Sequence, residues 1–193
     1  TLGTSLQLTA GDADDSGDSD LTIDDAVTVG TDIDLVAENN VIVNQAITSL
    51  DPVDGNVVIV ADSDGDGTGG GGISFGPGGS VTAAGLGLSA GDDIGTAEDD
   101  GDVPLVIDVD TLAVQSGGDI NIIDTDDGIT LADEVIGVFE RVSGAQAGGS
   151  LEIEAQDNNG GNDGFIVANG VVSAGTELEL LAEDDITLNN NVT

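Results

Sequence analysis

The sequence predicts an all-β protein folded as a right-handed parallel β-helix. Short segments with apolar residues at alternate positions recur throughout the 193 residues, among them SLQL, DIDLVA, VVIVA, SLEIEA and ELELLA. This alternation is typical of strands with one buried face. Clusters of Gly, Asp and Asn separate the segments, as expected for tight turns that use left-handed backbone angles.

An internal duplication predicts stacked units rather than a closed globule. Residues 30–48, GTDIDLVAENNVIVNQAIT, align without a gap with residues 175–193, GTELELLAEDDITLNNNVT, at an offset of 175 − 30 = 145. Residues 4–10 align with residues 149–155 at the same offset. We expect a single rod over residues 1–193, built of a partial unit (1–47), a divergent unit (48–142) with a long insertion at 91–110, and a unit (143–193) that matches residues 1–48.

The strand segments also predict the size of one coil. They begin again about every 19 to 20 residues, as from Leu112 to Leu131. We therefore expect roughly ten coils, stacked about 4.8 Å apart into a rod about 50 Å long. Residues 132–142, ADEVIGVFERV, are the one candidate for a short helix, and they contain Arg141, the single basic residue.

The composition excludes several classes of function. The chain has 39 acidic residues against one basic residue, a net charge of -38, and it lacks His, Cys, Met, Trp, Tyr and Lys. There is consequently no imidazole base, no thiolate, no Schiff-base lysine and no Cys/His metal site. Nucleic acid and anionic membranes would be repelled, and no apolar run approaches the length of a membrane span.

Three Asp-rich loops follow the same kind of strand in three copies: GDADDSGDSD (11–20), DSDGDGTGGGG (62–72) and QDNNGGNDG (156–164). This recurring place argues against a flexible linker. Calcium takes six to eight oxygen ligands in irregular geometry, so alternating Asp and Asn with Gly suits it. We expect Ca²⁺ as the cofactor, with the candidate ligands Asp12, Asp14, Asp15, Asp18, Asp20, Asp62, Asp64, Asp66, Asp124, Asp126, Asp157, Asn158 and Asp163.

A true EF-hand is excluded, because position twelve of the loop that begins at Asp62 is Ile73 and not Glu. The alternative interpretation, solvated acidic turns that keep the rod soluble, stays open for every loop. The turns AENN, AGDD and AEDD before strands predict structural capping of backbone groups. Asn44 and Asn189 suggest ladders of Asn along the rod. Six further carboxylates are expected to be solvated: Asp32, Asp34, Glu152, Glu154, Glu177 and Glu179.

The segments GTDIDLVAENNVIVNQAIT, SGGDINIIDTDDGITLA and GTELELLAEDDITLNNNVT resemble the filamentous haemagglutinin-type β-helix of large bacterial surface adhesins and exoproteins. The resemblance covers nearly the whole chain. It implies a long, secreted protein with a structural or adhesive role, located outside the cell or at its surface. The extreme acidity and the lack of lysine depart from that family.

These observations predict a non-enzymatic rod segment of an extracellular filament or giant adhesin, stabilised by divalent cations. Read from tail to head, NNNVT–TLGTSLQLTA parallels residues 44–61, NQAIT–SLDPVDGNVVIVA, which predicts end-to-end continuation, either covalent or between chains. One alternative is a recognition module that binds a cell-surface receptor or glycan through residues 91–110. A remote alternative is a polysaccharide-degrading β-helix enzyme with clustered aspartates, although aromatic and basic residues to hold a sugar are scarce.

Overall fold

The computed structural model describes residues 5–11, 19–63, 71–95, 103–125, 128–137, 141–157 and 163–193. These residues contain no helix, and hence none that could cross a membrane. The strands are β1 (Leu6–Ala10), β2 (Leu21–Ile23), β3 (Val27–Val29), β4 (Ile33–Ala37), β5 (Val41–Val43), β6 (Ala46–Ser49), β7 (Asn56–Val60), β8 (Ile73–Phe75), β9 (Ser80–Ala90), β10 (Leu105–Ser116), β11 (Ile120–Asp124), β12 (Ile129–Leu131), β13 (Val135–Ile136), β14 (Arg141–Val142), β15 (Ala145–Ala147), β16 (Leu151–Ala155), β17 (Ile166–Ala168), β18 (Val172–Ala174), β19 (Leu178–Ala182) and β20 (Ile186–Leu188).

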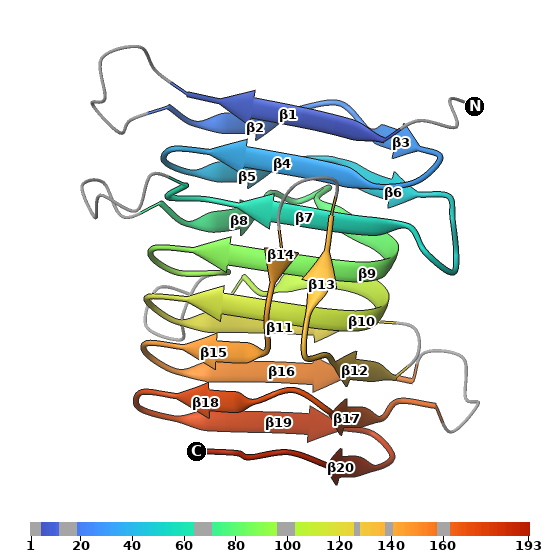
Figure 1. The fold of residues 1–193 in the computed structure, drawn as a ribbon, viewed down its shortest axis with the longest axis vertical. Helices are drawn as coiled ribbons and strands as arrows, with labels where there is room; N and C mark the ends of the chain where they lie inside the picture. Colours follow the sequence, from blue (N-terminus) through green and yellow to red (C-terminus); the bar gives the residue numbers. More distant parts are fainter. Residues whose placement is uncertain are drawn as a thin grey trace.

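The all-β prediction is confirmed, and the strands are mostly parallel. Fifteen strands form one large sheet, while β2, β5 and β8 form a sheet of three. Bridges from Ile73 to Ile94 and from Ile94 to Ile120 connect the smaller sheet to β11. Figure 1 shows the strands stacked in levels, with the N-terminus at one end and the C-terminus at the other. This arrangement is consistent with a β-solenoid.

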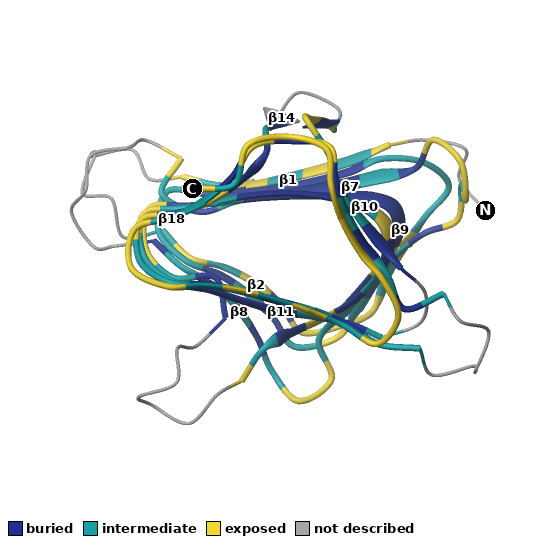
Figure 2. Cartoon of the chain, turned by 90° about the horizontal axis from the view of Figure 1, so that it is seen from below, coloured by how far each residue is buried: buried dark blue, intermediate teal, exposed yellow. Residues whose placement is uncertain are grey.

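Each level has two sides, which the strand pairing defines. The first side consists of β1, β4, β7 and the second halves of β9 and β10, and it continues as β12 with β15, β17 with β18, and β20 with Val192. The second side consists of β2 with β3, β5 with β6, β8 with the first half of β9, and Ile94 with the first half of β10, and it continues as β11, β16 and β19. Viewed along the stack, successive levels overlie one another, and many strand residues are coloured as buried (Figure 2).

The levels are fewer and longer than the sequence predicts. The register can be followed on the first side through Leu6, Ile33, Val57, Leu86, Leu112, Leu131, Ala168 and Leu188, which makes eight levels and not ten. The predicted spacing holds at two steps along the chain, 131 − 112 = 19 and 188 − 168 = 20. The other steps range from 57 − 33 = 24 to 168 − 131 = 37, because long turns and one hairpin are inserted between strands.

Apolar side chains at alternate positions fill the space between the two sides. In β4 the inward residues Ile33 and Leu35 are fully buried, with β1 on one side of them and β7 on the other. One hydrophobic cluster runs through all levels of the described chain. Complete burial of each such side chain stabilises the fold by about 1.5–3 kcal/mol.

The candidate helix at 132–142 is wrong, since these residues include the antiparallel hairpin β13–β14. The hairpin lies across the outside of the first side (Figure 1), where Val135 and Val142 pack against Val58 and Ala113 in a second hydrophobic cluster. The Asn56 side-chain amide donates a hydrogen bond of 2.8 Å to the Ile136 carbonyl. Pairing of β-branched residues and burial of this small apolar surface favour strands over a helix.

The hairpin also corrects the prediction for Asp34. This outward carboxylate of β4 is fully buried and not solvated. A Cβ at Gly137 would collide with its Oδ1, so the backbone after β13 lies directly over the carboxylate.

The duplication extends to strand bounds and register. Adding 145 to the bounds of β1, β2, β3, β4 and β5 gives the bounds of β16, β17, β18, β19 and β20. The pair Leu6–Ile33 becomes Leu151–Leu178, and the pair Leu21–Val41 becomes Ile166–Ile186. The two copies lie on opposite sides, however: β1 is on the first side and β16 is on the second. One repeat of 145 residues therefore spans a whole number of levels plus half a level.

The duplicated positions offer a matched test of how much each level depends on the next. Leu35 is fully buried between two levels, whereas its counterpart Leu180 is partly exposed and has no described strand below it. We expect Leu35→Ala to lower the free energy of unfolding by about 2–5 kcal/mol, and Leu180→Ala to lower it by clearly less. Urea denaturation followed by circular dichroism measures both. Equal losses would contradict a fold in which each level is buried by its neighbours.

Candidate functional site: the acidic turns and the uncovered ends

A column of mostly polar residues runs along one edge of the stack. Each member directly precedes the first strand residue or bridge residue of a level on the second side: Asp20, Asn40, Gly72, Asp93, Asp119 and Ser150. The strands pair in register, so these positions lie one above another.

Side-chain oxygens in this column accept backbone N–H groups of the next level. Asn40 donates from its backbone N–H to Asp20 Oδ1 at 3.1 Å, and Gly72 N–H donates to Asn40 Oδ1 at 3.0 Å. Asp119 N–H donates to Asp93 Oδ1 at 2.7 Å. Ser150 donates to Asp119 Oδ1 from its N–H at 2.6 Å and from its hydroxyl at 2.8 Å. The predicted capping role of AENN and AGDD is thereby confirmed.

The same kind of bond occurs elsewhere in the described chain. Gly164 N–H donates to Asp184 Oδ2 at 3.1 Å, which confirms the capping role of AEDD. The two residues expected in Asn ladders each bond to the level above, but only Asn189 bonds to another Asn, so a ladder along the rod stays a prediction. Asn44 donates to Asp24 at 2.8 Å, and Asn189 donates to Asn169 at 3.0 Å, at positions that the duplication relates to each other. These bonds stabilise the stack because they satisfy backbone or amide groups between levels.

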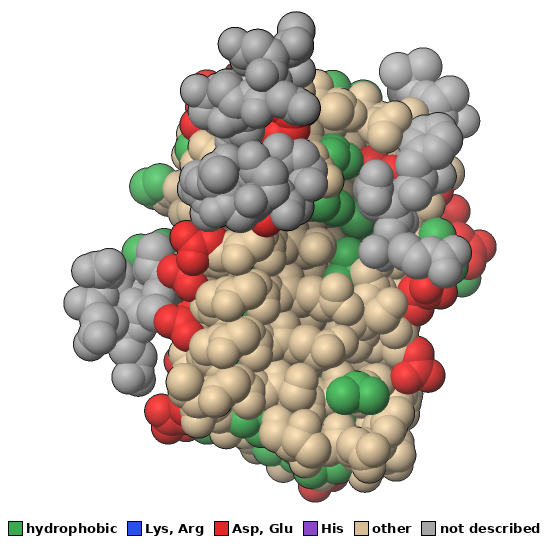
Figure 3. Space-filling view, turned by 60° about the vertical axis from the view of Figure 1, so that its left-hand side comes forward, with side chains coloured by type: hydrophobic (Ala, Val, Ile, Leu, Met, Phe, Trp, Pro, Cys, Tyr) green, Lys and Arg blue, Asp and Glu red, His purple; other side chains and the backbone are tan. Residues whose placement is uncertain are grey.

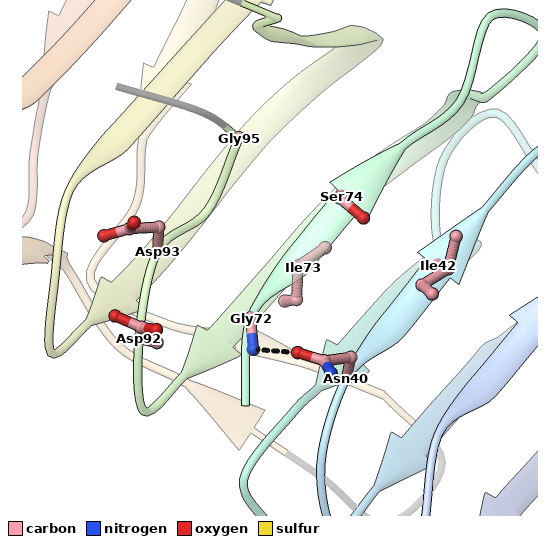
Figure 4. Close-up of a pocket in the computed structure, with 8 residues that line it drawn as sticks. All are labelled: Asn40, Ile42, Gly72, Ile73, Ser74, Asp92, Asp93 and Gly95. Carbon is pink, nitrogen blue, oxygen red and sulfur yellow. Dashed lines mark hydrogen bonds between the residues drawn. The ribbon is translucent and has the colours of Figure 1, made fainter. Parts of the chain in front are cut away.

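The column is interrupted at Gly72, which has no side chain to offer. A shallow pocket of about 330 Å³ lies there, with Asn40, Asp92 and Asp93 among its lining residues (Figure 4). Partial burial raises the pKa of the Asp92 carboxyl, and the neighbouring carboxylates of Asp93 and Asp119 raise it further.

On one face of the stack, the acidic side chains lie along the borders. Figure 3 shows one face in which uncharged atoms form a broad central area and carboxylates gather along its two borders. Successive turns of the stack also bring glycines together. A Cβ at Gly117 would collide with the Gly91 carbonyl, and a Cβ at Gly148 would collide with the Gly117 carbonyl. Glycine is needed at these positions because successive turns approach each other through their backbones.

The described strands that flank the three Asp-rich loops differ in side. β1 and β7 lie on the first side and are followed by β2 and β8 on the second, whereas β16 lies on the second side and is followed by β17 on the first. The duplication therefore places the strands that flank the third loop on the opposite sides. Most residues of the loops lie outside the described ranges, so their shared structural position stays a prediction.

Five of the predicted calcium ligands are described by the structure, which gives the following contacts for them. Asp20 belongs to the polar column, and Asp124 is buried at the end of β11, where its Oδ1 accepts the Val109 N–H at 3.3 Å. Asp62 has a φ of 56° and lies against Gly91 of the next level. Asp157 donates its N–H to Glu183 at 3.0 Å, and the Asp163 carbonyl accepts the Phe165 N–H at 2.9 Å.

The remaining predicted ligands lie outside the described residues: Asp12, Asp14, Asp15, Asp18, Asp64, Asp66, Asp126 and Asn158. Within the described ranges, no group of three or more acidic side chains is placed to hold a metal ion. Calcium binding stays a prediction from the loop sequences.

No described strand covers either end of the stack. The lower end, formed by β19, β20 and Val192, exposes Ile186 by 45% and Leu188 by 51%. Their counterparts Val41 and Val43 are 0% exposed, because β8 lies below them. The upper end, formed by β1, β2 and β3, leaves six inward residues only partly buried: Leu6, Leu8, Ala10, Leu21, Val27 and Val29. Sequence reasoning did not single out these residues, although their place in the outermost copies was a usable signal.

No family model matches the chain, and no curated protein or solved structure matches it. The resemblance to haemagglutinin-type repeats therefore stays an expectation, and function is argued from the geometry.

Asp20 distinguishes the capping role from a calcium role. Its Oδ1 accepts N–H groups of Asn39 and Asn40, at 2.8 Å and 3.1 Å. We expect Asp20→Asn to retain stability in EDTA, because the amide oxygen still accepts, and Asp20→Ala to lose about 0.5–1.5 kcal/mol. Thermal and urea unfolding measure the difference. Asp20 would instead belong to a metal site if the two variants were equally stable without calcium and if calcium stabilised the unmodified chain but neither variant.

Asp92 predicts a dependence of stability on pH. Because the pKa of its carboxyl is raised in the folded state, stability from this group is present below the ordinary carboxyl pKa and is lost as the pH rises through the raised value. We expect Asp92→Asn to raise Tm at about pH 7 and to leave Tm unchanged at about pH 3. Asp54→Asn, at an exposed turn, is the control for loss of one negative charge. An equal rise in that control would show general charge relief rather than an effect of the pocket.

Proposed function

We propose that this chain is a structural rod segment, a right-handed parallel β-helix that joins further units end to end in an extracellular filament or giant adhesin. The observation that carries the proposal is the pair of uncovered ends. Ile186 and Leu188 are exposed at positions whose counterparts Val41 and Val43 are fully buried by a further level. A further unit at each end would bury this apolar surface, and removal of apolar surface from water is favourable.

The duplication supports the same role. A pattern that repeats strand bounds and register from one copy to the other is suited to extension, because each new level reuses the contacts of the previous one. Sheet edges with unpaired backbone groups also favour addition of another strand. Continuation between separate chains and continuation within a longer chain use the same contacts.

A non-enzymatic role is supported by the composition, which offers carboxylates but no imidazole, thiol or lysine. The described carboxylates of the polar column accept backbone N–H groups, which is a structural use. An extracellular or cell-surface location is proposed from the resemblance to secreted β-helices. A recognition role of residues 91–110 toward a receptor or glycan is the alternative, and part of this segment lies outside the described residues.

Sedimentation velocity at rising protein concentration tests the proposal. We expect species larger than a monomer to grow with concentration, and to grow further in calcium than in EDTA at matched ionic strength, because divalent cations reduce repulsion between chains of charge -38. Magnesium is the control for a calcium-specific effect. A monomer at every concentration, in calcium and in about 1 M NaCl alike, would contradict end-to-end association of separate chains.

A further inference from the structure

Within the chain, the counterparts of the strands at each end are covered by a further level. At the lower end, β19 and β20 are the counterparts of β4 and β5, which are covered by β7 and β8. At the upper end, β1 and β2 are the counterparts of β16 and β17, which are covered by β11 and β12. These four internal pairings show that each end strand accepts a parallel, in-register neighbour on the face that is now open.

The two ends fit together in one orientation better than in the other, because the sides differ in strand length. At the lower end, the second side has the five-residue strand β19. The first side has the three-residue strand β20 together with Val192. The upper end has the opposite arrangement, with five residues in β1 on the first side and three each in β2 and β3 on the second. The five-residue strands β19 and β1 therefore face each other only when one unit is rotated by half a turn about the stacking axis.

The alternative, a long strand against two short strands, occurs within this chain together with an insertion. It occurs where β10 passes to β12 and β15, and there residues 132–144, which include the β13–β14 hairpin, separate the two short strands. The other steps on this side, such as β1 to β4, β4 to β7 and β17 to β20, join strands of like length in register.

We propose that a second copy of this chain binds the lower end with its upper end after a half-turn about the stacking axis. Its β1 then pairs with β19, its β2 with β20, and its β3 with the chain around Val192. The inference rests on the proposed end-to-end function and adds the orientation of neighbouring units. It is the same change of side that relates β1 to β16 within one chain.

Side chains at the junction agree with this orientation. The register of β16 with β19 sets Glu152 beside Glu179, a like-charge pair on neighbouring strands. β1 of the docked copy would lie on the open side of β19, where Gln7 and Thr9, the counterparts of Glu152 and Glu154, add no second like-charge pair beside Glu179. β1, β2 and β3 contain no acidic residue in a chain that has 39, although charges on edge strands are the usual protection against stacking.

Among the described residues of the junction, one pair of like charges remains. Thr187 lies beside Thr22 of the second copy, which places Asp185 beside Asp20 of that copy. Salt screens such a pair, so association in this orientation strengthens with ionic strength.

Disulfide trapping tests the orientation, because the chain has no cysteine of its own. Residues paired in register on parallel strands lie about 4.8 Å apart, within the Cα separation of about 4.4–6.8 Å that a disulfide spans. The variant Thr187→Cys with Thr22→Cys reports the half-turn. The matched variant Glu179→Cys with Thr22→Cys reports docking without rotation, which sets β2 against β19. In both variants the two cysteines lie at opposite ends of one molecule, so a disulfide joins different molecules.

Each variant is oxidised at about 1 M NaCl, where the screening length is about 3 Å, and is analysed by non-reducing electrophoresis and sedimentation. Circular dichroism of the reduced samples checks that the fold is retained. We expect most of the Thr187/Thr22 variant to become disulfide-linked oligomers, and the Glu179/Thr22 variant to stay monomeric.

Three results would overturn the inference. Cross-linking of the Glu179/Thr22 variant alone, or of both variants equally, would contradict the half-turn and leave end-to-end association standing. Association without cross-linking in either variant would show a different contact between copies. A monomer in every sample would contradict both the orientation and the proposed association of separate chains.

Discussion

The structure depends on one relation, the in-register stacking of apolar side chains from one level on those of the next. Ile33 is fully buried because Leu6 lies on one side of it and Val57 on the other. Where the neighbour is absent, as below Ile186, a residue of the same kind at the equivalent position is half exposed. No single level has a core of its own, so burial, backbone pairing and the polar column all depend on correct placement of the adjacent level.

This relation also explains how a folded protein tolerates so much negative charge. The inward positions are apolar, which leaves turns and outward faces for the carboxylates. At the turns, Asp93 and Asp119 accept backbone N–H groups of the following level, so part of the charge compensates partial positive charges. At the gap beside Gly72, partial burial and the neighbouring carboxylates of Asp93 and Asp119 raise the pKa of Asp92, although a backbone hydrogen bond from Asp93 lowers it.

Local patterns predicted what depends on local sequence. Alternation identified the strands, and the constant offset between the two copies located five strands of one copy from those of the other. Level length was not predictable from Leu112 and Leu131 alone, because the inserted turns differ from level to level. The burial of Asp34 results from contact with Gly137, which is distant in the sequence, and that of Asp124 from its place between Ile107 and Ala155. Nothing in the residues around either aspartate indicates such contacts.

The hairpin β13–β14 has a mechanical consequence. Along most of the stack, each level is held to the next by its own row of backbone hydrogen bonds, so tension along the axis can peel the levels away one at a time. Around the hairpin, Val142 contacts Gly87, while Val135 and Val142 share a cluster with Val58 of β7 and Ala113 of β10. The strands β7, β9 and β10 belong to successive levels, and the hairpin packs against all three from the outside. Under load they must separate together, which makes the middle of the segment its stiffest part and leaves the ends as the first regions to yield.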